Sequence, residues 1–387
     1  MHDPQVLIVG AGIAGLAVGR ALLSRGVSGE IVDRATAFPV AGAGLYLPGN
    51  GVRAITALGL ADPLAARSVR IPQQRILNHH GRLLTRIDLR RVWGRIGPCV
   101  GIRRADLHRI LLDGAAGVPI RLGTTVRAVT QTPENVLVQF EDGLARSYDV
   151  VIGADGINSS IRRLVFGDIQ PRDVGQISWR FVADDPCGVT TWTAMLARGR
   201  AFLMVPVGLD GLYCYADLMR RGAEATFPWS DAAEKGHVGS HDHDRDALRT
   251  LFRDFAEPVP RILAQLDRVD EIHVGPIEEV DLDRCVDRRV VLVGDAAHAT
   301  SPNMAQGASM ALEDAQILAA ALSSGDSPLE ALAAFAARRR ARVRWVQQRT
   351  HHRDRIRDLP SWLRNLSLRI AGVAIYKADY RPLFDEP

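Results

Sequence analysis

The residues best suited to chemistry are the glycines of Gly10-Ala11-Gly12-Ile13-Ala14-Gly15, which follow the apolar run at residues 6–9. A buried strand, a glycine turn and a helix together hold the pyrophosphate of a dinucleotide on the helix N-terminus. Gly10 permits the tight turn, Gly12 lets the backbone approach the phosphate, and Gly15 lets the helix pack on the strand. The pattern predicts a dinucleotide site, although an ordinary tight turn between strand and helix is the simpler alternative.

Three aspartates stand where strands are expected to end. Asp33 closes a second apolar run, where its carboxylate could accept hydrogen bonds from an adenosine ribose. Asp155 follows the run at 148–153, and Asp295 follows the run at 290–293. Ligands of doubly wound sheets bind at this carboxyl edge. After Pro302 the chain enters a helix whose N-terminal amides could face an electron-rich ring.

The composition describes an ordinary globular chain. It has 387 residues, 47% of them hydrophobic and 24% charged, with a net charge of +4 that does not argue for nucleic acid. The four cysteines show no Cys-x-x-Cys spacing, which disfavours a disulfide framework or a zinc site. The first strand starts near residue 5 and the run 13–23 is too short for a membrane span. We therefore expect a cytoplasmic protein without a signal peptide or transmembrane segment.

The elements that must position these residues fall into distinct groups. Residues 4–33 predict a β-α-β unit, helices are expected at 52–58, 104–112 and 308–322, and further helices lie within 247–266. After Pro171, strand-like alternation predicts an antiparallel sheet with one face toward an apolar cavity. Its expected strands are 175–183, 190–196, 201–207 and 212–218. Candidate cavity walls are Trp179, Phe181, Trp192, Phe202, Met204, Tyr213 and Tyr215, half of which must point away because strand side chains alternate.

The three motifs, in this order, resemble those of the class A flavoprotein monooxygenases, the para-hydroxybenzoate hydroxylase type. The segments GIRRADLHRILL, GADGINSSIRR and VVLVGDAAHATSPNMAQGASMALEDA are similar to that family's arginine-containing helix, DG motif and GD motif. The chain looks most like the short salicylate- and urate-hydroxylase-like members. The resemblance covers the chain to about residue 350.

The resemblance implies an α/β fold with a discontinuous Rossmann-type FAD-binding domain and an inserted antiparallel substrate domain. The FAD domain would comprise 1–70, 96–170 and 280–325, and the substrate domain 71–95 and 171–279. Residues 326–387 would form a C-terminal helical region. Only one Rossmann fingerprint is present, and the family explains this because its nicotinamide reaches the flavin transiently, without a domain of its own.

The resemblance also implies site residues. Gly10, Gly12 and Gly15 would hold the FAD pyrophosphate, Asp33 the adenosine ribose, and Arg34 would lie against the adenine. Arg104 would reach the pyrophosphate or ribityl region, Asp155 would serve FAD and the NAD(P)H path, Asp295 would bind the ribityl chain, and Gly307 would lie under the flavin edge. Further expected FAD contacts are Ala14, Gly44, Leu45, Val126, Gly156, Pro302, Gln306 and Ala308.

Two departures from the family pattern are visible. Asp33 stands where glutamate is usual, and Ala305 stands where many members have glycine. The shorter acid can still reach a ribose. The extra methyl of Ala305 could alter the movement of the flavin.

The implied activity is FAD-dependent hydroxylation of an aromatic or heteroaromatic small molecule with NADH or NADPH and O₂, through a flavin C4a-hydroperoxide. Arg180 is a candidate partner for a substrate carboxylate or phenolate, and Tyr215 a candidate hydrogen-bond partner. Alternatives on the same scaffold are epoxidation, N-hydroxylation, Baeyer–Villiger oxidation and isoprenoid reduction. A non-catalytic flavin-binding partner or sensor is the alternative of another class. The chain is expected to be a monomer or homodimer.

Other polar clusters favour structural roles. We expect the histidines within 229–246 to lie in a solvated loop and to bind no metal, and His298 to be structural. The arginine cluster at 338–344 predicts a solvated helix face, or a helix packed on the FAD domain, rather than a nucleic-acid site. A lipid-surface role for this helix and segment 366–376 is a further alternative.

Overall fold

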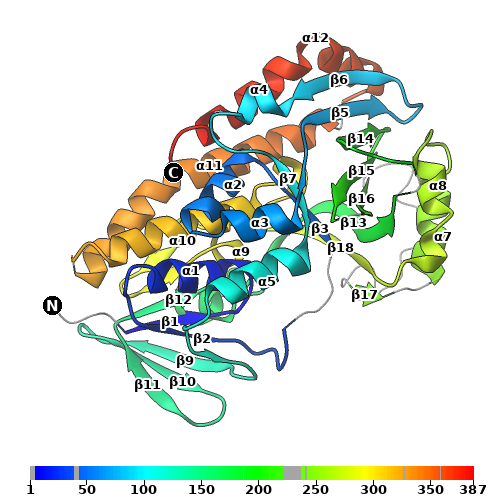
Figure 1. Cartoon of the computed structure of the whole chain (residues 1–387). Coiled ribbons are helices and arrows are strands. Elements are labelled where there is room, and N and C mark those ends of the chain that lie inside the picture. The colour runs from blue at the N-terminus through cyan, green and yellow to red at the C-terminus, as the bar shows by residue number, and fades with distance from the viewer. Residues whose placement is uncertain are drawn as a thin grey trace.

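The computed structural model describes residues 5–38, 43–185, 187–208, 210–220, 237–239, 242–325, 327–357 and 359–387. Its fold is the mixed α/β architecture expected from the sequence (Figure 1).

A largely parallel sheet carries the N-terminal glycine motif. β1 (Val6–Val9) pairs in parallel with β2 (Gly29–Val32) and β12 (Val150–Gly153), so that Val6 lies opposite Gly29 and Val150. The strand order is β19-β20-β12-β1-β2-β8, with the outer strands β8 (Ile120–Arg121), β20 (Val290–Leu292) and β19 (Val286–Asp287). Strands buried on both faces read as continuous apolar runs, which explains the sequence of β1.

Layers on both faces bury these strands. Val6 and Ile8 pack toward α1 (Ile13–Leu23), α5 (Arg104–Gly114) and α10 (Gly307–Leu322). Leu7 and Val9 pack on the other side, against β9 (Val126–Gln131), β10 (Val136–Phe140) and β11 (Ala145–Tyr148). The carboxyl ends of β1, β12 and β20 therefore open toward one edge of the sheet, where Asp155 and Asp295 follow.

A second, mixed sheet lies beside the first (Figure 1). Its order is β17-β18-β13-β16-β15-β14-β5-β6, and β14 pairs with β5 in parallel. The strands are β5 (Gln73–Asn78), β6 (Leu83–Asp88), β13 (Arg172–Asp184), β14 (Trp192–Leu196), β15 (Arg200–Val207), β16 (Gly211–Met219), β17 (His237–Gly239) and β18 (Ile272–Glu279). Residues 71–95 thus contribute strands to the same sheet as 171–279. We propose that the two sheets mark the cofactor and substrate domains at the boundaries predicted above.

Smaller elements connect these layers. β3 (Gly44–Leu47), β4 (Val69–Arg70) and β7 (Val100–Arg103) form a small sheet between the larger ones. The helices α2 (Gly49–Ala57), α3 (Ala61–Arg67) and α4 (Leu89–Trp93) join them. Single turns occur at η1 (Arg162–Phe166), η3 (Leu266–Arg268), η4 (Pro302–Met304) and η5 (Arg381–Leu383).

The predicted loop at 229–246 is wrong at its C-terminal end. Residues 242–251 form helix α7 (Asp242–Leu251), and His237 lies in β17, whereas His241 falls outside the described residues. α7 and α8 (Val259–Leu263) bury apolar side chains such as Leu248 and Ile262 against the mixed sheet. This packing stabilises a helix whose first turn is too polar to be recognised from sequence.

Long helices close the C-terminal part of the chain. α11 (Pro328–Arg357) runs along α10, and α12 (Ser361–Tyr380) covers β6 at the edge of the mixed sheet (Figure 1). Within the part of the chain that the structure describes, no helix combines the length and apolarity that a membrane span requires.

Candidate active site

A cavity of about 570 Å³ extends from the carboxyl edge of the parallel sheet to the mixed sheet. At the end next to the parallel sheet, the cavity is lined by residues predicted to contact FAD, and these come from every motif. These are Gly12, Ala14, Gly44, Leu45, Arg104, Gly156, Asp295, Pro302, Gln306, Gly307 and Ala308. Segments that are far apart in the sequence therefore converge on one space.

The glycine turn leaves a wall without side chains. A Cβ on Gly15 would lie 1.8 Å from the carbonyl oxygen of Gly10, and a Cβ on Gly10, at φ +112°, would lie 2.4 Å from the carbonyl oxygen of Ala154. A Cβ on Gly12 would instead meet no protein atom within 4 Å. Gly12 faces the cavity at the start of α1, where the helix dipole favours a phosphate. The turn fits the pyrophosphate of FAD.

Asp33 fixes the glycine turn. Its Oδ2 accepts a hydrogen bond from the backbone N of Ala11 at 2.6 Å, and its Oδ1 accepts one from the backbone N of Ala35 at 2.8 Å. Arg34 beside it is exposed, and Val126 is buried in the core under the sheet. None of these three residues lines the cavity, and their predicted contacts with the adenosine half of FAD stay predictions.

Asp155 organises the turn after β12. Its carboxylate accepts hydrogen bonds from the hydroxyl groups of Ser159 and Ser160 and from the backbone N of Ser160 and Ile161. The neighbouring Gly156 lines the cavity, whereas Asp155 does not. The proposed contact of Asp155 with FAD or the nicotinamide therefore stays a prediction, and the geometry gives the carboxylate a local structural task.

Asp295 lies open to the cavity opposite the start of α10. Its side chain is exposed, and a Cβ on Gly307 would come within 3.8 Å of its Oδ1. Arg104, at the first turn of α5, is also exposed to the cavity. A carboxylate suits ribityl hydroxyls and a guanidinium suits phosphate oxygens, so both fit an extended flavin dinucleotide.

Ala305 holds a strained backbone beside this space. Its φ of +49° and ψ of 40° lie in the left-handed region, at the end of η4, and its methyl group lines the cavity. This conformation costs an L-residue about 1–2 kcal/mol. Ala305, where many members of the resembled family have glycine, therefore occupies a position whose backbone geometry favours glycine.

We expect the Ala305→Gly variant to be more stable than the parent by about 0.5–1 kcal/mol. Relief of the left-handed strain outweighs the added chain entropy of glycine in the unfolded state. Urea unfolding of the FAD-free protein measures the difference. An equal or lower midpoint would show that the methyl group makes compensating contacts. Ala308→Gly, in the same segment but in a helix, serves as the control and should be destabilising.

Gln306 is anchored by a buried network that reaches α11. The amide Nδ2 of Asn50 donates to Oε1 of Gln306 at 2.9 Å and to Oε1 of Glu313 at 3.0 Å. Glu313 also pairs at 2.8 Å with both Arg339 and Arg342. These arginines are 2% and 9% exposed, so the predicted solvated face is wrong for them. The alternative expectation of a helix packed on the FAD domain is confirmed by the contacts of α11 with α10.

His298 contributes to the same network. Its Nε2 lies 2.7 Å from Oδ2 of Asp314, which also accepts from the backbone N of Gly294 at 2.9 Å. Burial by itself would raise the pKa of Asp314, but His298 and Arg339 lower it to about 2. His298 thus takes part in a structural contact with Asp314, as the sequence predicted, and this contact holds the turn that presents Asp295.

The other end of the cavity is one face of the mixed sheet. Cross-strand registers place Gln74, Trp192 and Tyr213 in one row, and Ile76, Ala194, Leu203 and Tyr215 in the next. Trp179, Phe181, Phe202 and Met204 point to the opposite face and pack with α7 and α8. Alternation therefore selects Trp192, Tyr213 and Tyr215 from the predicted walls.

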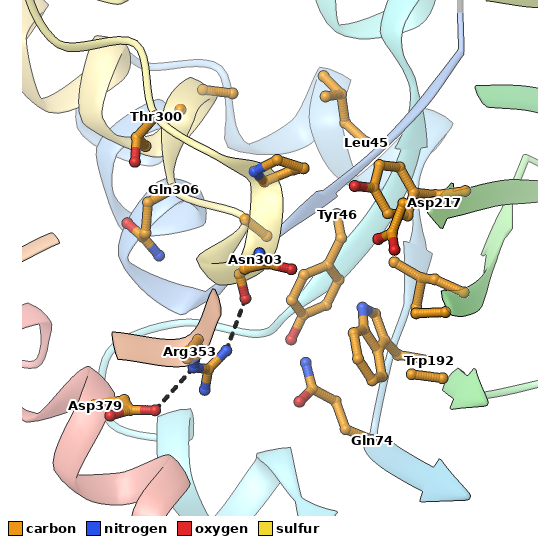
Figure 2. A pocket seen from close by; sticks show the side chains of 18 of the residues that line it. Leu45, Tyr46, Gln74, Trp192, Asp217, Thr300, Asn303, Gln306, Arg353 and Asp379 are labelled. Carbon is orange, nitrogen blue, oxygen red and sulfur yellow. Dashed lines mark hydrogen bonds and ion pairs between the residues drawn. The ribbon is translucent and has the colours of Figure 1, made fainter. Parts of the chain in front are cut away.

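Tyr46, Gln74 and Trp192 lie around one space at this end (Figure 2). The rings of Tyr46 and Trp192 have centroids 6.4 Å apart at an angle of 54°. The hydroxyl of Tyr215 and Oδ2 of Asp217 are buried and have no hydrogen-bond partner among the described residues. Buried polar atoms normally have partners, so these two point to a ligand.

Arg180 lies beside Tyr215 on the same face of the mixed sheet but outside the cavity lining. It lies opposite Tyr215 on β16 and His273 on β18, but it is absent from the residues that line the cavity. Its proposed contact with substrate stays a prediction, whereas Tyr215 faces the cavity directly.

Arginines of α11 were missed by the sequence analysis. Arg353 pairs with Asp379 at 2.8 Å and donates to the backbone carbonyl of Asn303 at 2.8 Å (Figure 2). Arg357 donates to the side chains of Asp217 and Asn303. Both clamp η4 at the junction of the cavity ends. A sequence signal for these arginines exists, because they continue the stripe of inward-facing positions along α11. That stripe comprises Phe335, Arg339, Arg342, Val346, Thr350, Arg353 and Arg357.

No cluster of His, Cys, Asp and Glu suited to a metal ion occurs in the described part of the chain. The arrangement joins a cradle for a dinucleotide to a recess lined by aromatic side chains.

Comparisons with known proteins agree with this geometry. Residues 3–350 match the family model described as FAD binding domain. A 2-heptyl-3-hydroxy-4(1H)-quinolone synthase of Pseudomonas aeruginosa is 29% identical over 388 residues, covering 98% of this chain and 97% of the relative. A 3-amino-4-hydroxybenzoate 2-monooxygenase of Streptomyces cremeus is 33% identical over 363 residues, covering 90% and 86%.

A solved structure shows the same architecture. Klebsiella pneumoniae HpxO, complexed with FAD and uric acid, superposes with a TM-score of 0.81 at 25% identity, over 98% of this chain and 92% of that one.

Proposed function

This chain belongs to the FAD binding domain family, among the class A flavoprotein monooxygenases, and from that premise we propose that it hydroxylates an uncharged heteroaromatic ring with NAD(P)H and O₂. It is a FAD-dependent oxidoreductase of the aromatic hydroxylase type. The substrate and the use of a nicotinamide reductant are parts of our proposal.

The observation that carries this proposal is the continuity of the cavity. One space is lined by Asp295 and Gly307 at the cofactor end and by Trp192 and Tyr215 at the mixed sheet. When bound, FAD supplies the redox chemistry that couples the reductant to O₂. Gly12, Arg104 and Asp295 would hold it, and the loop 302–308 would border its ring system.

The polar atoms beside the ring site favour a ring with its own donors and acceptors. Burial raises the pKa of Tyr215 well above its ordinary value, so the phenol stays protonated and can donate to a ring carbonyl or hydroxyl. Oδ2 of Asp217 can accept from a ring N–H. The amide of Gln74 offers both functions at the opposite side. A quinolone-type ring, like that named for the Pseudomonas relative, presents such groups.

The charged residues of α11 that line the cavity disfavour a carboxylate on the ring. Arg353 and Arg357 face the cavity, but each is already paired, with Asp379 and Asp217 respectively. The remaining oxygen of Asp217 would repel a second carboxylate. A benzoate, as in the name of the Streptomyces relative, is the contrasting candidate.

The test is a measurement of flavin reduction and O₂ consumption with a panel of rings. The FAD-loaded enzyme is mixed with NADH or NADPH and with quinolones, phenols, purines or benzoates. Faster reduction with uncharged heteroaromatic rings, and incorporation of labelled oxygen from O₂ into the product, are expected. Stimulation by benzoates alone would refute the assignment of substrate, and product without label would refute hydroxylation.

Removing the hydroxyl of Tyr215 should weaken ring binding. For Tyr215→Phe we expect the Kd of the stimulating ring to rise about tenfold, because one buried hydrogen bond contributes about 1–1.5 kcal/mol. Titration of the flavin absorbance with the ring measures this Kd. Tyr148→Phe, which removes a phenol that bonds Glu30 far from the cavity, is the matched control. An unchanged Kd in Tyr215→Phe would exclude the contact.

A further inference from the structure

The cavity continues past the ring site into an apolar channel beneath α12. Its floor is the same sheet face, two to four residues beyond Trp192 along β14, and its roof is formed by the end of α11 and the inner face of α12. The floor contains Ile76, Ala194, Leu196, Ala201 and Leu203, and the roof contains Ile356, Leu359, Leu368 and Ile375. The polar residues that line this part of the cavity are Asp217, which lies beside Ala201 on the neighbouring strand, and Arg357, Arg364 and Ser367. Asp217 pairs with Arg357, and Arg364 donates to a backbone carbonyl, so the lining that remains for a ligand is mainly apolar.

Small side chains make the space. Ala194 and Ala201 point to the cavity from neighbouring strands, where the pairs Ala194–Leu203 and Leu196–Ala201 lie side by side. From Trp192 to Leu196 the strand advances four residues, or about 13 Å at ~3.3 Å per residue. The channel therefore runs for about 13 Å along β14, and larger residues at 194 and 201 would occupy part of it.

The roof is fixed at several points. A Cβ on Gly372 would lie 2.6 Å from Oγ1 of Thr85, so α12 packs closely on β6. Nη1 of Arg364 donates to the carbonyl of Ala197 at 2.7 Å at the far end, and Nε1 of Trp93 donates to the hydroxyl of Tyr376 at 2.9 Å. These contacts hold the channel open in the folded protein.

The chemistry of the lining defines the occupant. Hydrocarbon gains free energy on transfer from water to an apolar space, whereas a polar chain would lose hydrogen bonds there. We propose that the substrate carries an aliphatic chain on its ring and that this chain lies in the channel under α12. The inference rests on the proposed function, which places the ring beside Trp192 and Tyr215.

The dependence of affinity on chain length tests the proposal. The FAD-loaded enzyme is titrated with a quinolone bearing a hydrogen, methyl, propyl, heptyl or nonyl group, and Kd is read from the flavin absorbance. We expect Kd to fall about fourfold per methylene, the equivalent of ~0.8 kcal/mol per buried CH₂, until the channel is full. A Kd that does not depend on chain length would overturn the channel, even if the ring is hydroxylated.

A chain ending in a carboxylate is the contrasting probe. Arg364 lies at the far end, and burial lowers its pKa to about 10. Weaker binding than that of the methyl-ended chain is expected, because the anion must be desolvated among apolar residues. Tighter binding would overturn the aliphatic assignment and identify Arg364 as an anion partner.

A substitution that fills the channel tests the same proposal through catalysis. In Ala201→Leu we expect the ratio of kcat/KM between the heptyl and unsubstituted rings to fall at least tenfold. Ala374→Leu adds the same volume on the exposed face of α12 and should leave the ratio unchanged. FAD content and urea unfolding show whether each variant is folded. If no ring binds or reacts with either chain, the proposed function fails. If rings react with an unchanged ratio, only the channel fails.

Discussion

Replacement of Gly12 by valine should abolish FAD binding while the fold remains intact. The side chain would point into the cavity, where a Cβ meets no protein atom within 4 Å. The backbone at Gly12, with φ −80° and ψ −169°, is extended and suits an L-residue. The new methyl groups would occupy the path of the pyrophosphate and separate it from the amides at the start of α1.

The expected loss is at least about 100-fold in the Kd for FAD. Two hydrogen bonds to a charged phosphate, each contributing about 1.5 kcal/mol, amount to about 3 kcal/mol. Equilibrium dialysis of the FAD-free protein with FAD measures the change, and urea unfolding of the same protein checks the fold. Gly12→Ala should show an intermediate loss, because one methyl group displaces the phosphate less.

Gly15→Ala is the informative contrast. Its Cβ would lie 1.8 Å from the carbonyl oxygen of Gly10, so the variant should lose stability as well as FAD. Normal FAD affinity in a folded Gly12→Val protein would show that the pyrophosphate lies elsewhere. The pair of variants separates the space reserved for the ligand from the space required for packing.

Replacement of Arg339 by methionine should destabilise the protein by about 3–5 kcal/mol, because it removes a cation shared by two buried carboxylates and leaves Glu313 with Arg342 and Asp314 with His298. Arg339 is 2% exposed and pairs with Glu313 at 2.8 Å and with Asp314 at 2.7 Å. Guanidinium unfolding measures the effect. Arg340→Met, at the exposed neighbouring position, should change the stability by less than about 0.5 kcal/mol. Equal effects at the two positions would refute a buried network.

The same network predicts a pH dependence. The pKa of Asp314 is about 2 in the folded protein against 3.8 ordinarily, so folding favours its charged form. Its contribution to stability is complete above about pH 5 and is lost as the pH falls through 3.8 toward 2. Arg339→Met should raise the pKa of folded Asp314 toward its ordinary value, so that Asp314 contributes less stability at neutral pH and less is lost on acidification. The unfolding midpoint measured from pH 7 to pH 3 in both proteins provides the comparison.

The cofactor end of the site could be predicted from the sequence because its signals are local. A strand, a glycine turn and a helix must lie within a few residues of one another, and each glycine in that turn has a steric reason. Asp295 and Gly307 likewise belong to one continuous motif. FAD and the family followed from such segments, and the matched residues 3–350 confirm both.

Charged residues on α11 were misjudged for a physical reason. Arginines at 338–344 are solvated unless acids are buried opposite them, and the partners Glu313 and Asp314 lie on a different helix. The sequence alone cannot show this pairing, because the desolvation cost is recovered only when both helices pack. The same is true of Arg353, whose partner Asp379 is on α12.

The sequence by itself determined the fold class, the dinucleotide turn and the alternation of the inserted strands, because each depends on short-range sterics and on periodicity. Only the tertiary structure decided which face of those strands lines the cavity. Trp192 and Tyr215 face the cavity, while Trp179 and Phe181 lie in the opposite core. The alternation of side chains along a strand shows that the two faces differ. Which face lines the cavity depends on the packing of α7, α8 and α12, which come from distant parts of the chain.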